Sequence, residues 1–451
     1  MRLFVGLTTS DLSGLLHDSA SVSCAGSASV WSMPIADLLN DPPSKAAASL
    51  FELAPQEVLS ATATANHQLK FAHKTETTLK PYYMLRVAPN TASSALCFNS
   101  VSRAGNKAGS PRYHGRFFII PAQNKVRVVL ETDLESYIKG VLQSEIPASF
   151  HIEAIKAQAV TARTYALHPR IDHSNDSCNV CDSYLCCQYF AGLQTIGYQH
   201  EEAIAATAGQ IVTYRNQPIL ALFSSCAGGH TESYENCFSD AKTGAFPPPA
   251  LPYLVGVPEG KLPSGYNDQS APTEQAMRSL WAMPHPQTVD GDASQFRWSA
   301  HVPAQDLESH MHHVVQTMKA TPDTAPFVIP PDGGQFGQIK SFNITKRGVA
   351  GTAIEMSIDT SAGVWRVKKE LVIRSCFKLP DLKIARLRSA RIFFDHHYDK
   401  LRLLSAVDIH GLGFGHGVGL QQTGAQGLAK QGSNYRQIIA HYFHKAEVSK
   451  V

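Results

Sequence analysis

The sequence lacks several features that would assign it to a special class of protein. No apolar run approaches the roughly 20 residues that cross a bilayer, so no transmembrane segment is predicted. Charged residues make up only 17%, and 40 basic against 37 acidic side chains give a net charge of +3. Because no dense stripe of Lys or Arg is present either, we expect no nucleic-acid partner. No repeat of fixed period is visible. The remaining composition, 43% hydrophobic with 31 Gly and 26 Pro, is globular.

The N-terminus also lacks a convincing export signal. Arg2 is followed by a weakly apolar stretch that Asp11, His17 and Asp18 interrupt, which does not indicate a secretory apolar region. Cys24 follows small residues as in a lipoprotein cleavage site, but the apolar stretch before it is too broken. Export of this chain would therefore need a signal that is not evident in this sequence.

The two parts of the chain differ in how clearly they predict structure. Residues 1–120 contain isolated strand patterns between weak segments, and we predict a strand-rich accessory region there. Residues 121–451 are predicted to form one domain with a loop-rich insertion at about 240–340. Helices and strands are segregated along the chain rather than strictly alternating, which predicts an α+β fold.

Two consecutive helices are predicted after a strand at 125–130. The first begins near Asp133 and runs toward Glu145, where Pro147 disfavours helical geometry at the preceding residue. The second covers residues 152–167 and is predicted to be amphipathic, since one face carries Ile155, Ala159, Ala162 and Ala166.

Three separated segments carry a recognisable constellation of residues. They are Ser144-Glu145-Ile146-Pro147 with the helix after it, the run Phe-Ser-Ser-Cys-Ala-Gly-Gly-His-Thr-Glu at 223–232, and the Gly/His-rich run at 413–425. In this order they resemble the stage II sporulation protein D (SpoIID) family, which overlaps the amidase enhancers, over about residues 125–445. The resemblance implies a SpoIID-type catalytic domain of lytic-transglycosylase type. Such an enzyme cleaves peptidoglycan glycan strands stripped of stem peptides, in wall remodelling or division, and is periplasmic or otherwise exported.

Glu145 is the predicted catalytic residue. A glycosidic oxygen leaves when it is protonated, and a carboxylic acid does this at neutral pH when apolar surroundings raise its pKa. A single acid/base carboxylate suffices for transglycosylation, because the C6 hydroxyl of the muramic acid attacks its own anomeric carbon. Glu232 and Glu235 are candidates either for assisting the reaction or for a structural role. The alternative interpretation of Glu145 is an ordinary helix-capping residue.

Glycines and hydroxyl groups of the other two segments suit recognition of acetamido sugars. Glycine permits close approach of backbone to a ligand, and Ser supplies donors and acceptors. His416 between two glycines is read either as a sugar ligand or as a structural imidazole. The predicted substrate-binding residues are Ser224, Ser225, Gly228, Gly229, His416 and Gln422.

The nine cysteines include a dense cluster at 178–187, which suggests a metal site. The cluster resembles the family's Cys-x4-His-Cys-Gln-x-Tyr segment, in which some members bind zinc together with an upstream His; here Cys186 replaces the His. The resemblance implies a structural zinc ion, not needed for catalysis. Its ligands would be His173, Cys181, Cys186 and Cys187, with Cys178 as a substitute. Disulfides, which Cys226 and Cys237 could also form, and free thiols remain alternatives.

Two functions are consistent with these features. The first is cleavage of the MurNAc-GlcNAc bond by Glu145. The second is a non-catalytic amidase enhancer that binds glycan and activates a partner N-acetylmuramoyl-L-alanine amidase. Departures from the family pattern at Cys186 and Thr423 leave this second function as an alternative. A zinc-dependent hydrolase is disfavoured, because no His-Glu-x-x-His or comparable open site is present.

Overall fold

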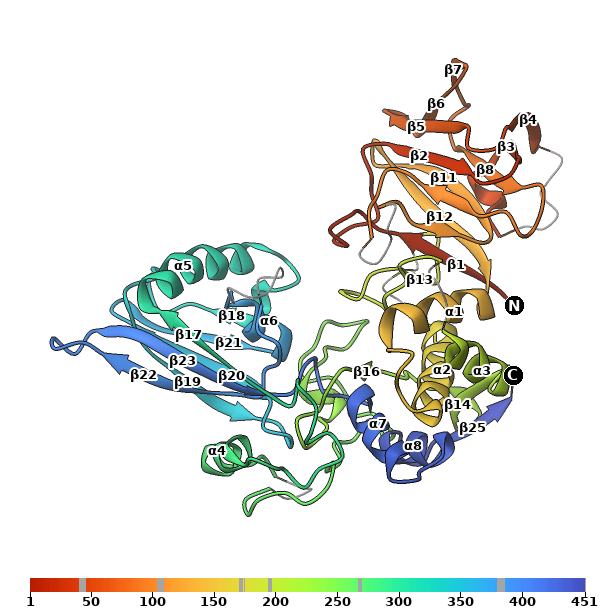
Figure 1. Ribbon diagram of the computed structural model, residues 1–451. Coiled ribbons are helices and arrows are strands. Elements are labelled where there is room, and N and C mark those ends of the chain that lie inside the picture. Colours follow the sequence, from red (N-terminus) through yellow and green to blue (C-terminus); the bar gives the residue numbers. More distant parts are fainter. Residues whose placement is uncertain are drawn as a thin grey trace. The chain divides into compact units, whose positions relative to one another are not determined.

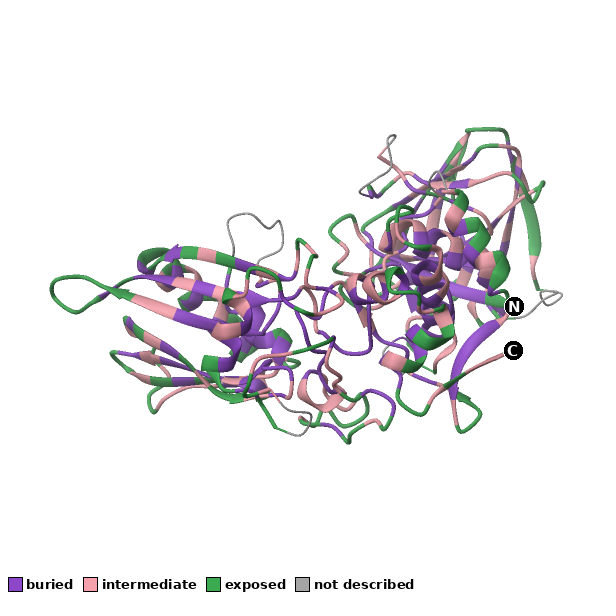
Figure 2. Ribbon diagram, turned by 60° about the horizontal axis from the view of Figure 1, so that its bottom comes forward, coloured by how far each residue is buried: buried purple, intermediate pink, exposed green. Residues whose placement is uncertain are grey.

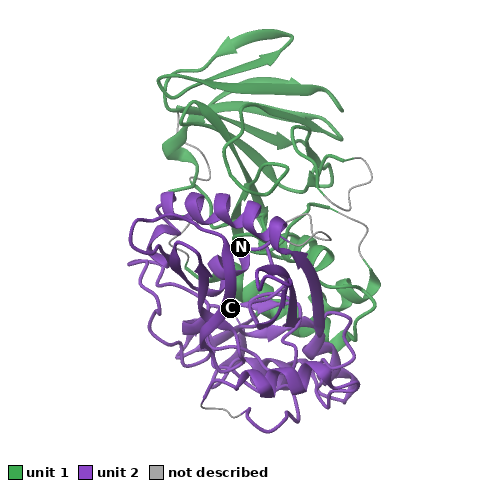
Figure 3. Cartoon of the chain, turned by 90° about the vertical axis from the view of Figure 1, so that its left-hand side faces the viewer, with its two compact units in different colours: residues 1–210 green, residues 211–451 purple. Residues whose placement is uncertain are grey.

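The computed structural model describes residues 1–39, 46–103, 109–169, 173, 175–193, 197–266, 270–378 and 386–450. The chain forms two compact units, residues 1–210 and 211–451, which Figure 3 colours separately. Both units combine helices with mainly antiparallel strands, which confirms the predicted α+β class. Among the described residues, no helix has the length and apolar character needed to cross a membrane.

Unit 1 is built on two β-sheets and three α-helices (Figure 1). Its strands are β1 (Arg2–Leu7), β2 (Ala20–Cys24), β3 (Ala28–Pro34), β4 (Ala48–Leu53), β5 (Val58–Thr64), β6 (Gln68–His73), β7 (Thr75–Thr78), β8 (Tyr83–Pro89), β9 (Leu96–Phe98), β10 (Arg112–Tyr113), β11 (Arg116–Ala122), β12 (Lys125–Asp133) and β13 (Val180–Cys181). One sheet has the order β13-β1-β12-β11-β8-β3-β4 and the other β10-β9-β2-β5-β6-β7. The strand-rich character predicted for residues 1–120 is therefore present.

The unit boundary differs from the predicted division at residue 120. Residue 120 lies in β11, and β11 pairs with β12 from Arg116 opposite Glu131 to Ala122 opposite Lys125. Since both strands form one hairpin within one sheet, the chain has no structural break there. The break between the compact units follows Gln210.

The helices of unit 1 are α1 (Leu134–Glu145), α2 (Ile152–Leu167) and α3 (Tyr198–Ala206), with a short η1 (Ile35–Asp37). The Asp133 side chain caps α1 by accepting a hydrogen bond from the Ser136 amide at 3.0 Å. Ile146, which precedes Pro147, has an extended backbone with φ −133° and ψ 132°, so α1 ends at Glu145. The helix predicted at 152–167 is confirmed as α2. Its predicted amphipathic character is wrong, because α2 is buried on nearly every side, including the polar Gln158.

Unit 2 contains four small sheets: β17-β23-β22, β18-β21-β20-β19, β15-β14-β25 and β16-β24. Its strands are β14 (Gln210–Tyr214), which begins at the unit boundary, β15 (Gln217–Pro218), β16 (Phe223–Ser224), β17 (Arg297–Pro303), β18 (Val328–Ile329), β19 (Ile339–Arg347), β20 (Ala353–Thr360), β21 (Gly363–Lys368), β22 (Ile392–Tyr398), β23 (Leu404–Leu412), β24 (Leu420–Gln421) and β25 (Glu447–Lys450). The helices are α4 (Glu274–Ala282), α5 (Ala304–Ala320), α6 (Glu370–Ser375), α7 (Gln422–Lys430), α8 (Tyr435–Tyr442), η2 (Tyr234–Asn236) and η3 (Ala325–Phe327).

The segment 240–340, expected to be a loop-rich insertion, contributes to the core of unit 2. It contains α4, α5, β17 and β18, and β17 pairs with β23 along its whole length. Leu307, Met311 and Val315 of α5 belong to the same apolar cluster as Val407 and Ile409 of β23. Figure 2 shows the buried residues inside each unit and the exposed residues on loops and strand ends.

Candidate functional site

Glu145 lies at the last position of α1 and is half-buried. The amide of Tyr189 donates a hydrogen bond to its Oε1 atom at 2.6 Å. The neighbouring Ser144 hydroxyl donates to the Gly140 carbonyl at 2.8 Å and accepts from the Ala191 amide at 3.1 Å. The amides of Tyr189 and Ala191 thus hold the segment 189–191 against the end of α1. The Tyr189 bond also fixes one oxygen of the Glu145 carboxyl group.

The segment that positions Glu145 is itself anchored in the core of unit 1. Gln188 is buried and its side-chain amide donates to the Tyr137 hydroxyl and to the Ala162 carbonyl, both at 3.2 Å. A Cβ at Gly140 would lie 2.2 Å from the Phe190 ring, so only glycine allows the ring to pack directly on α1. Sequence analysis treated residues 187–189 only as part of a metal motif and missed the role of Tyr189.

An ion pair between a buried arginine and a partly exposed glutamate joins α1 to α2. The fully buried Arg163 guanidinium donates two hydrogen bonds of 2.8 Å to the two carboxylate oxygens of Glu135, and a third of 2.9 Å to the Gln210 carbonyl. This bidentate geometry is the strong form of an Arg–carboxylate contact. Arg163 therefore holds the two helices in register.

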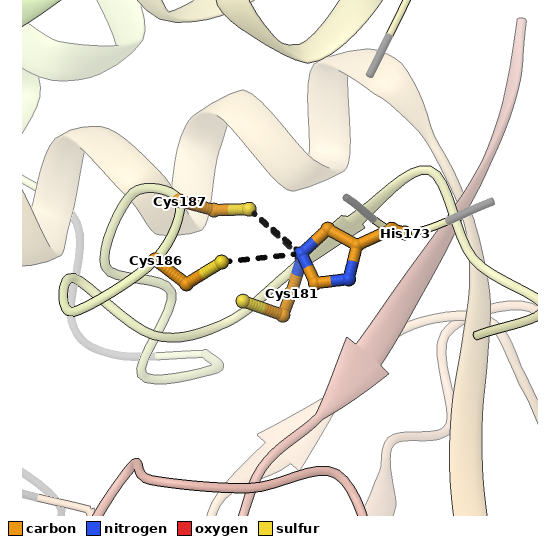
Figure 4. A group of neighbouring side chains, drawn as sticks. All are labelled: His173, Cys181, Cys186 and Cys187. Carbon is orange, nitrogen blue, oxygen red and sulfur yellow. Dashed lines mark hydrogen bonds between the residues drawn. The ribbon is translucent and has the colours of Figure 1, made fainter. Parts of the chain in front are cut away.

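The four predicted metal ligands come together beside β13. The nearest donor atoms of His173, Cys181, Cys186 and Cys187 all lie within 4.8 Å of one another. His173 Nε2 is 3.3 Å from the Cys187 sulfur and 3.4 Å from the Cys186 sulfur (Figure 4). In tetrahedral zinc sites, neighbouring ligand atoms are about 3.5–3.8 Å apart. The geometry of the cluster therefore suits an ion of this size.

The surroundings of this cluster also fit a metal. His173 Nδ1 is 3.1 Å from the Asp176 carboxylate, an arrangement that orients a ligating imidazole. Hydrogen bonds with Cys186 and Cys187, and then burial, raise the pKa of the Cys181 thiol.

The cysteines form no disulfide in this structure, in which all nine are described and all nine are free. Cys226 and Cys237, the candidates for a bridge, are buried in unit 2. The Cys226 thiol lies 3.5 Å from an Asp290 oxygen and that of Cys237 lies 3.5 Å from the His416 carbonyl. Both thiols therefore have separate polar contacts within unit 2.

The second and third motif segments pair with each other in unit 2. β16 runs parallel to β24, with Ser224 opposite Gln421, and Cys226 exchanges backbone hydrogen bonds of 2.9 and 3.1 Å with Phe414. A Cβ at Gly228, whose φ is +66°, would lie 2.5 Å from the Gly413 nitrogen. The glycine is required because the two loops approach at backbone distance.

Most of the predicted sugar-binding donors are already engaged within unit 2. The Ser224 hydroxyl donates to Gln421 Oε1 at 2.8 Å and accepts from the Gly417 amide at 3.1 Å. The Ser225 hydroxyl donates to Gln295 Oε1 at 2.7 Å. The Gly229 amide donates to Asp290 at 3.0 Å. Gly228, Gly229, Ser224 and Gln422 are buried, whereas Ser225 and His416 are partly exposed.

His416 is held as a neutral imidazole. The Val418 amide donates to its Nδ1 atom at 3.0 Å, so Nε2 carries the proton. Burial and the positive charge of Arg374 lower the pKa of His416 to about 4, against an opposing hydrogen bond to the backbone of Phe223. The ring is therefore uncharged at neutral pH and does not supply an acidic proton there.

Glu232, the alternative catalytic carboxylate, anchors two turns of unit 2. It is fully buried and accepts hydrogen bonds from the Asn236 side chain at 2.7 Å, the Ser233 amide at 2.9 Å, and the amides of Val349 and Ala350 at 3.1 Å. Burial raises its pKa, and these hydrogen bonds oppose the shift. A carboxylate with this many internal donors has a structural role. Glu235 lies in η2, directly after this turn, and is half-buried.

Sequence analysis missed a second buried carboxylate, Glu259, beneath the Gly-rich loop. Its amide donates to the Gly229 carbonyl at 2.9 Å, and its Oε2 atom accepts from the Tyr442 hydroxyl at 3.0 Å and lies 3.8 Å from His441 Nε2. Burial raises the pKa of Glu259 to about 7, and the nearby Asp290 charge adds to the shift. No motif marks this residue, because its partners lie far away in the sequence.

Glu259 should make the stability of unit 2 depend on pH. Because its folded-state pKa of about 7 exceeds its ordinary value of 4.5, its stabilising contribution is complete below about pH 4.5 and is lost as pH rises through 7. The loss should amount to about 3 kcal/mol in the free energy of unfolding. The free energy of unfolding, measured with denaturant, should therefore change less between pH 5 and pH 8 in Glu259→Gln than in the unmodified chain. Glu447→Gln, at an exposed position of β25, is the control; an equal pH dependence in all three proteins would contradict the prediction.

Two segments of the chain match family models. Residues 122–214 match the SpoIID family, described as stage II sporulation protein. Residues 241–419 match a domain of unknown function, DUF8618. The first match contains Glu145 and the cluster of His173 and three cysteines, and the second contains most of the chain's segment 240–340.

Three relatives resemble the chain over most of its length. An uncharacterized protein of Brachyspira hyodysenteriae is 25% identical over 336 residues, 74% of this chain and 72% of that protein. Stage II sporulation protein D of Bacillus subtilis is 25% identical, over 70% of this chain and 74% of that protein. The amidase enhancer of Bacillus subtilis is 24% identical over 68% of this chain, but the match spans only 39% of that protein. The domain at residues 122–214 and these relatives support membership of the SpoIID family.

Proposed function

We propose that this protein acts on the bacterial cell wall as a peptidoglycan lytic transglycosylase that cleaves the MurNAc-GlcNAc bond of glycan strands without stem peptides. The observation that carries the proposal is the fixed carboxyl group of Glu145, with the Tyr189 amide 2.6 Å from Oε1. In this proposal the segment around Glu145 supplies cleavage, and residues 1–120, which share the sheets of unit 1, have an accessory role. The protein would work in the periplasm or otherwise outside the cytoplasm.

Glu145 would transfer one proton in each direction. As the acid it protonates the glycosidic oxygen, and the bond to the anomeric carbon of the muramic acid breaks. As the base it then takes the proton from the C6 hydroxyl, whose oxygen attacks that carbon and closes the 1,6-anhydro ring. The hydrogen bond from the Tyr189 amide to Oε1 holds the carboxyl group in one orientation for both steps.

The proposed sugar-binding residues all lie within unit 2. Ser225 and His416 are the partly exposed members of the proposed set, and the Nδ1 bond fixes the ring of His416. Ser224, Gly228, Gly229 and Gln422 would act mainly by shaping the paired loops, since they are buried. No metal or other cofactor is needed for the proton transfers of this proposal.

The cluster of His173, Cys181, Cys186 and Cys187 would hold one structural zinc ion. Four protein ligands close the coordination sphere and leave no position for a catalytic water. The ion would instead fix the segment 181–190 on α2, where the Tyr165 hydroxyl already donates to the Cys186 carbonyl at 3.4 Å.

A second candidate function rests on the similarity to a relative named amidase enhancer. In that case the chain would bind glycan strands and activate an N-acetylmuramoyl-L-alanine amidase without cleaving anything itself. Ser224 and Gly229 donate hydrogen bonds within unit 2, and these bonds are compatible with both functions. Analysis of the reaction products is therefore needed to distinguish them.

The reaction product distinguishes the proposals. Purified protein incubated with amidase-stripped peptidoglycan should release fragments that end in 1,6-anhydro-muramic acid, lighter by one water than hydrolysed ends. Mass spectrometry of the fragments measures this directly, with intact peptidoglycan as the control substrate. Hydrated reducing ends would refute transglycosylation. Absence of new ends, combined with stimulation of an added amidase, would support the enhancer function instead.

A further inference from the structure

A second group of potential metal ligands lies on three neighbouring strands of unit 2. His301 on β17 is directly opposite Asp408 on the central strand β23, and His397 extends from β22 on the other side. Alternate residues of these strands, such as Val302 and Val407, point into the apolar core that includes α5. His301, Asp408 and His397 therefore belong to the opposite face of the sheet.

The three side chains converge on one point. His301 Nδ1 is 2.6 Å from Asp408 Oδ1, and His397 Nε2 is 2.7 Å from Asp408 Oδ2. Their candidate ligand atoms all lie within 4.8 Å of one another. The side chains remain open to solvent, with exposed fractions of 63% for His301, 48% for His397 and 30% for Asp408.

The rest of this sheet face is occupied by α4. Arg278 of α4 forms an ion pair of 2.8 Å with Asp395, the residue opposite Asp408, and Trp281 packs on His410 with ring centroids 4.6 Å apart. Asp395 therefore has a cationic partner from α4. The face beyond α4 is left uncovered at the His-Asp-His cluster.

Asp408 has no such partner. Within the part of the chain that the structure describes, its side chain makes polar contacts only with His301 and His397. Two imidazoles and one carboxylate are a donor set that suits zinc and other imidazole-binding divalent transition metals rather than magnesium or calcium.

We propose that His301, His397 and Asp408 form a surface binding site for a zinc ion in unit 2. Three protein ligands leave at least one coordination position open to water or to an external ligand. Because each ligand comes from a different strand, the bound ion would also tie the two flanking strands to β23. This site is separate from the closed cysteine cluster of unit 1 and does not depend on the proposed cleavage activity.

Calorimetric titration of the full chain with zinc chloride tests the site. We expect one equivalent whose affinity falls by more than about 10-fold in His301→Ala and in His397→Ala, because each variant removes a direct ligand. The same equivalent should raise the thermal unfolding temperature of the unmodified chain, since an ion that binds only the folded state stabilises it. Both substitutions lie at exposed positions, and circular dichroism verifies that the variants fold.

His313→Ala is the matched control, because His313 is an exposed histidine of α5 outside the cluster. It should bind zinc like the unmodified chain. The zinc ion assigned to this site is the one whose binding weakens when His301 or His397 is replaced. The test therefore gives the same answer whether or not the cysteine cluster also binds a metal. The proposal is overturned if no equivalent depends on these two residues, or if His313→Ala lowers the affinity equally.

Discussion

Glu145→Gln should cleave denuded glycan strands at least about 10²-fold more slowly than the unmodified chain. The substitution removes the transferable proton but keeps the size of the side chain. The amide oxygen of Gln still accepts the hydrogen bond that the Tyr189 amide donates to Oε1 at 2.6 Å. The geometry at the end of α1 is therefore retained, and glycan binding should survive while cleavage is lost.

The release of 1,6-anhydro ends per unit time measures this effect, and co-sedimentation with stripped peptidoglycan measures binding. Glu201→Gln is the matched control, because Glu201 is a half-exposed carboxylate of the same unit that pairs with Lys139 at 3.2 Å. It should cleave at the unmodified rate. If Glu145→Gln also cleaves at that rate, the acid lies elsewhere in the chain.

Cys187→Ser should remove about one zinc ion per chain and lower the free energy of unfolding of unit 1 by more than about 3 kcal/mol. Loss of one thiolate opens a closed four-ligand site and leaves the other ligands crowded without their cation. The sequence alone predicts that the metal and the acid chemistry are separate. The proposed metal site and the proposed acid are close in the chain, because Tyr189, two residues after Cys187, donates to Glu145. Cleavage should therefore fall together with zinc content.

Elemental analysis of the purified protein, a count of reactive thiols and denaturant unfolding provide the three measurements. Cys97→Ser is the control, because Cys97 lies in β9 of the same unit and outside the cluster. It should retain zinc and activity. An unmodified protein that contains no zinc and has blocked, reducible cysteines would contradict the prediction and favour a disulfide cluster.

Local signals in the sequence predicted the helices around Glu145 well. The Asp133 cap and Pro147 define both ends of α1 through interactions within a few residues. The sequence predicted the first and last residues of α2, but it did not predict that the helix is buried on nearly every side. Gln158 and Arg163 look like solvent-facing residues in an isolated helix, and they are buried because α2 lies at the centre of unit 1.

The roles of the charged residues depended more strongly on the fold. Glu232 sits in a motif beside glycines and was a reasonable second acid, yet the amides of Val349 and Ala350 arrive from more than a hundred residues away and occupy its oxygens. Glu259 carries no motif at all. Its raised pKa results from burial against residues of α8, a contact that no local pattern encodes.

The sequence by itself determined the α+β class, the strand and helices that lead to Glu145, and the family match of residues 122–214. These depend on periodicity, capping, proline and short motif spacing, all of which act over a few residues. Only the tertiary structure decided that the hairpin of β11 and β12 crosses residue 120, that the Tyr189 amide holds Glu145, and that His301, His397 and Asp408 meet on one sheet. Such contacts follow from strand pairing and burial between distant segments, whose free energies appear only when the whole chain is folded.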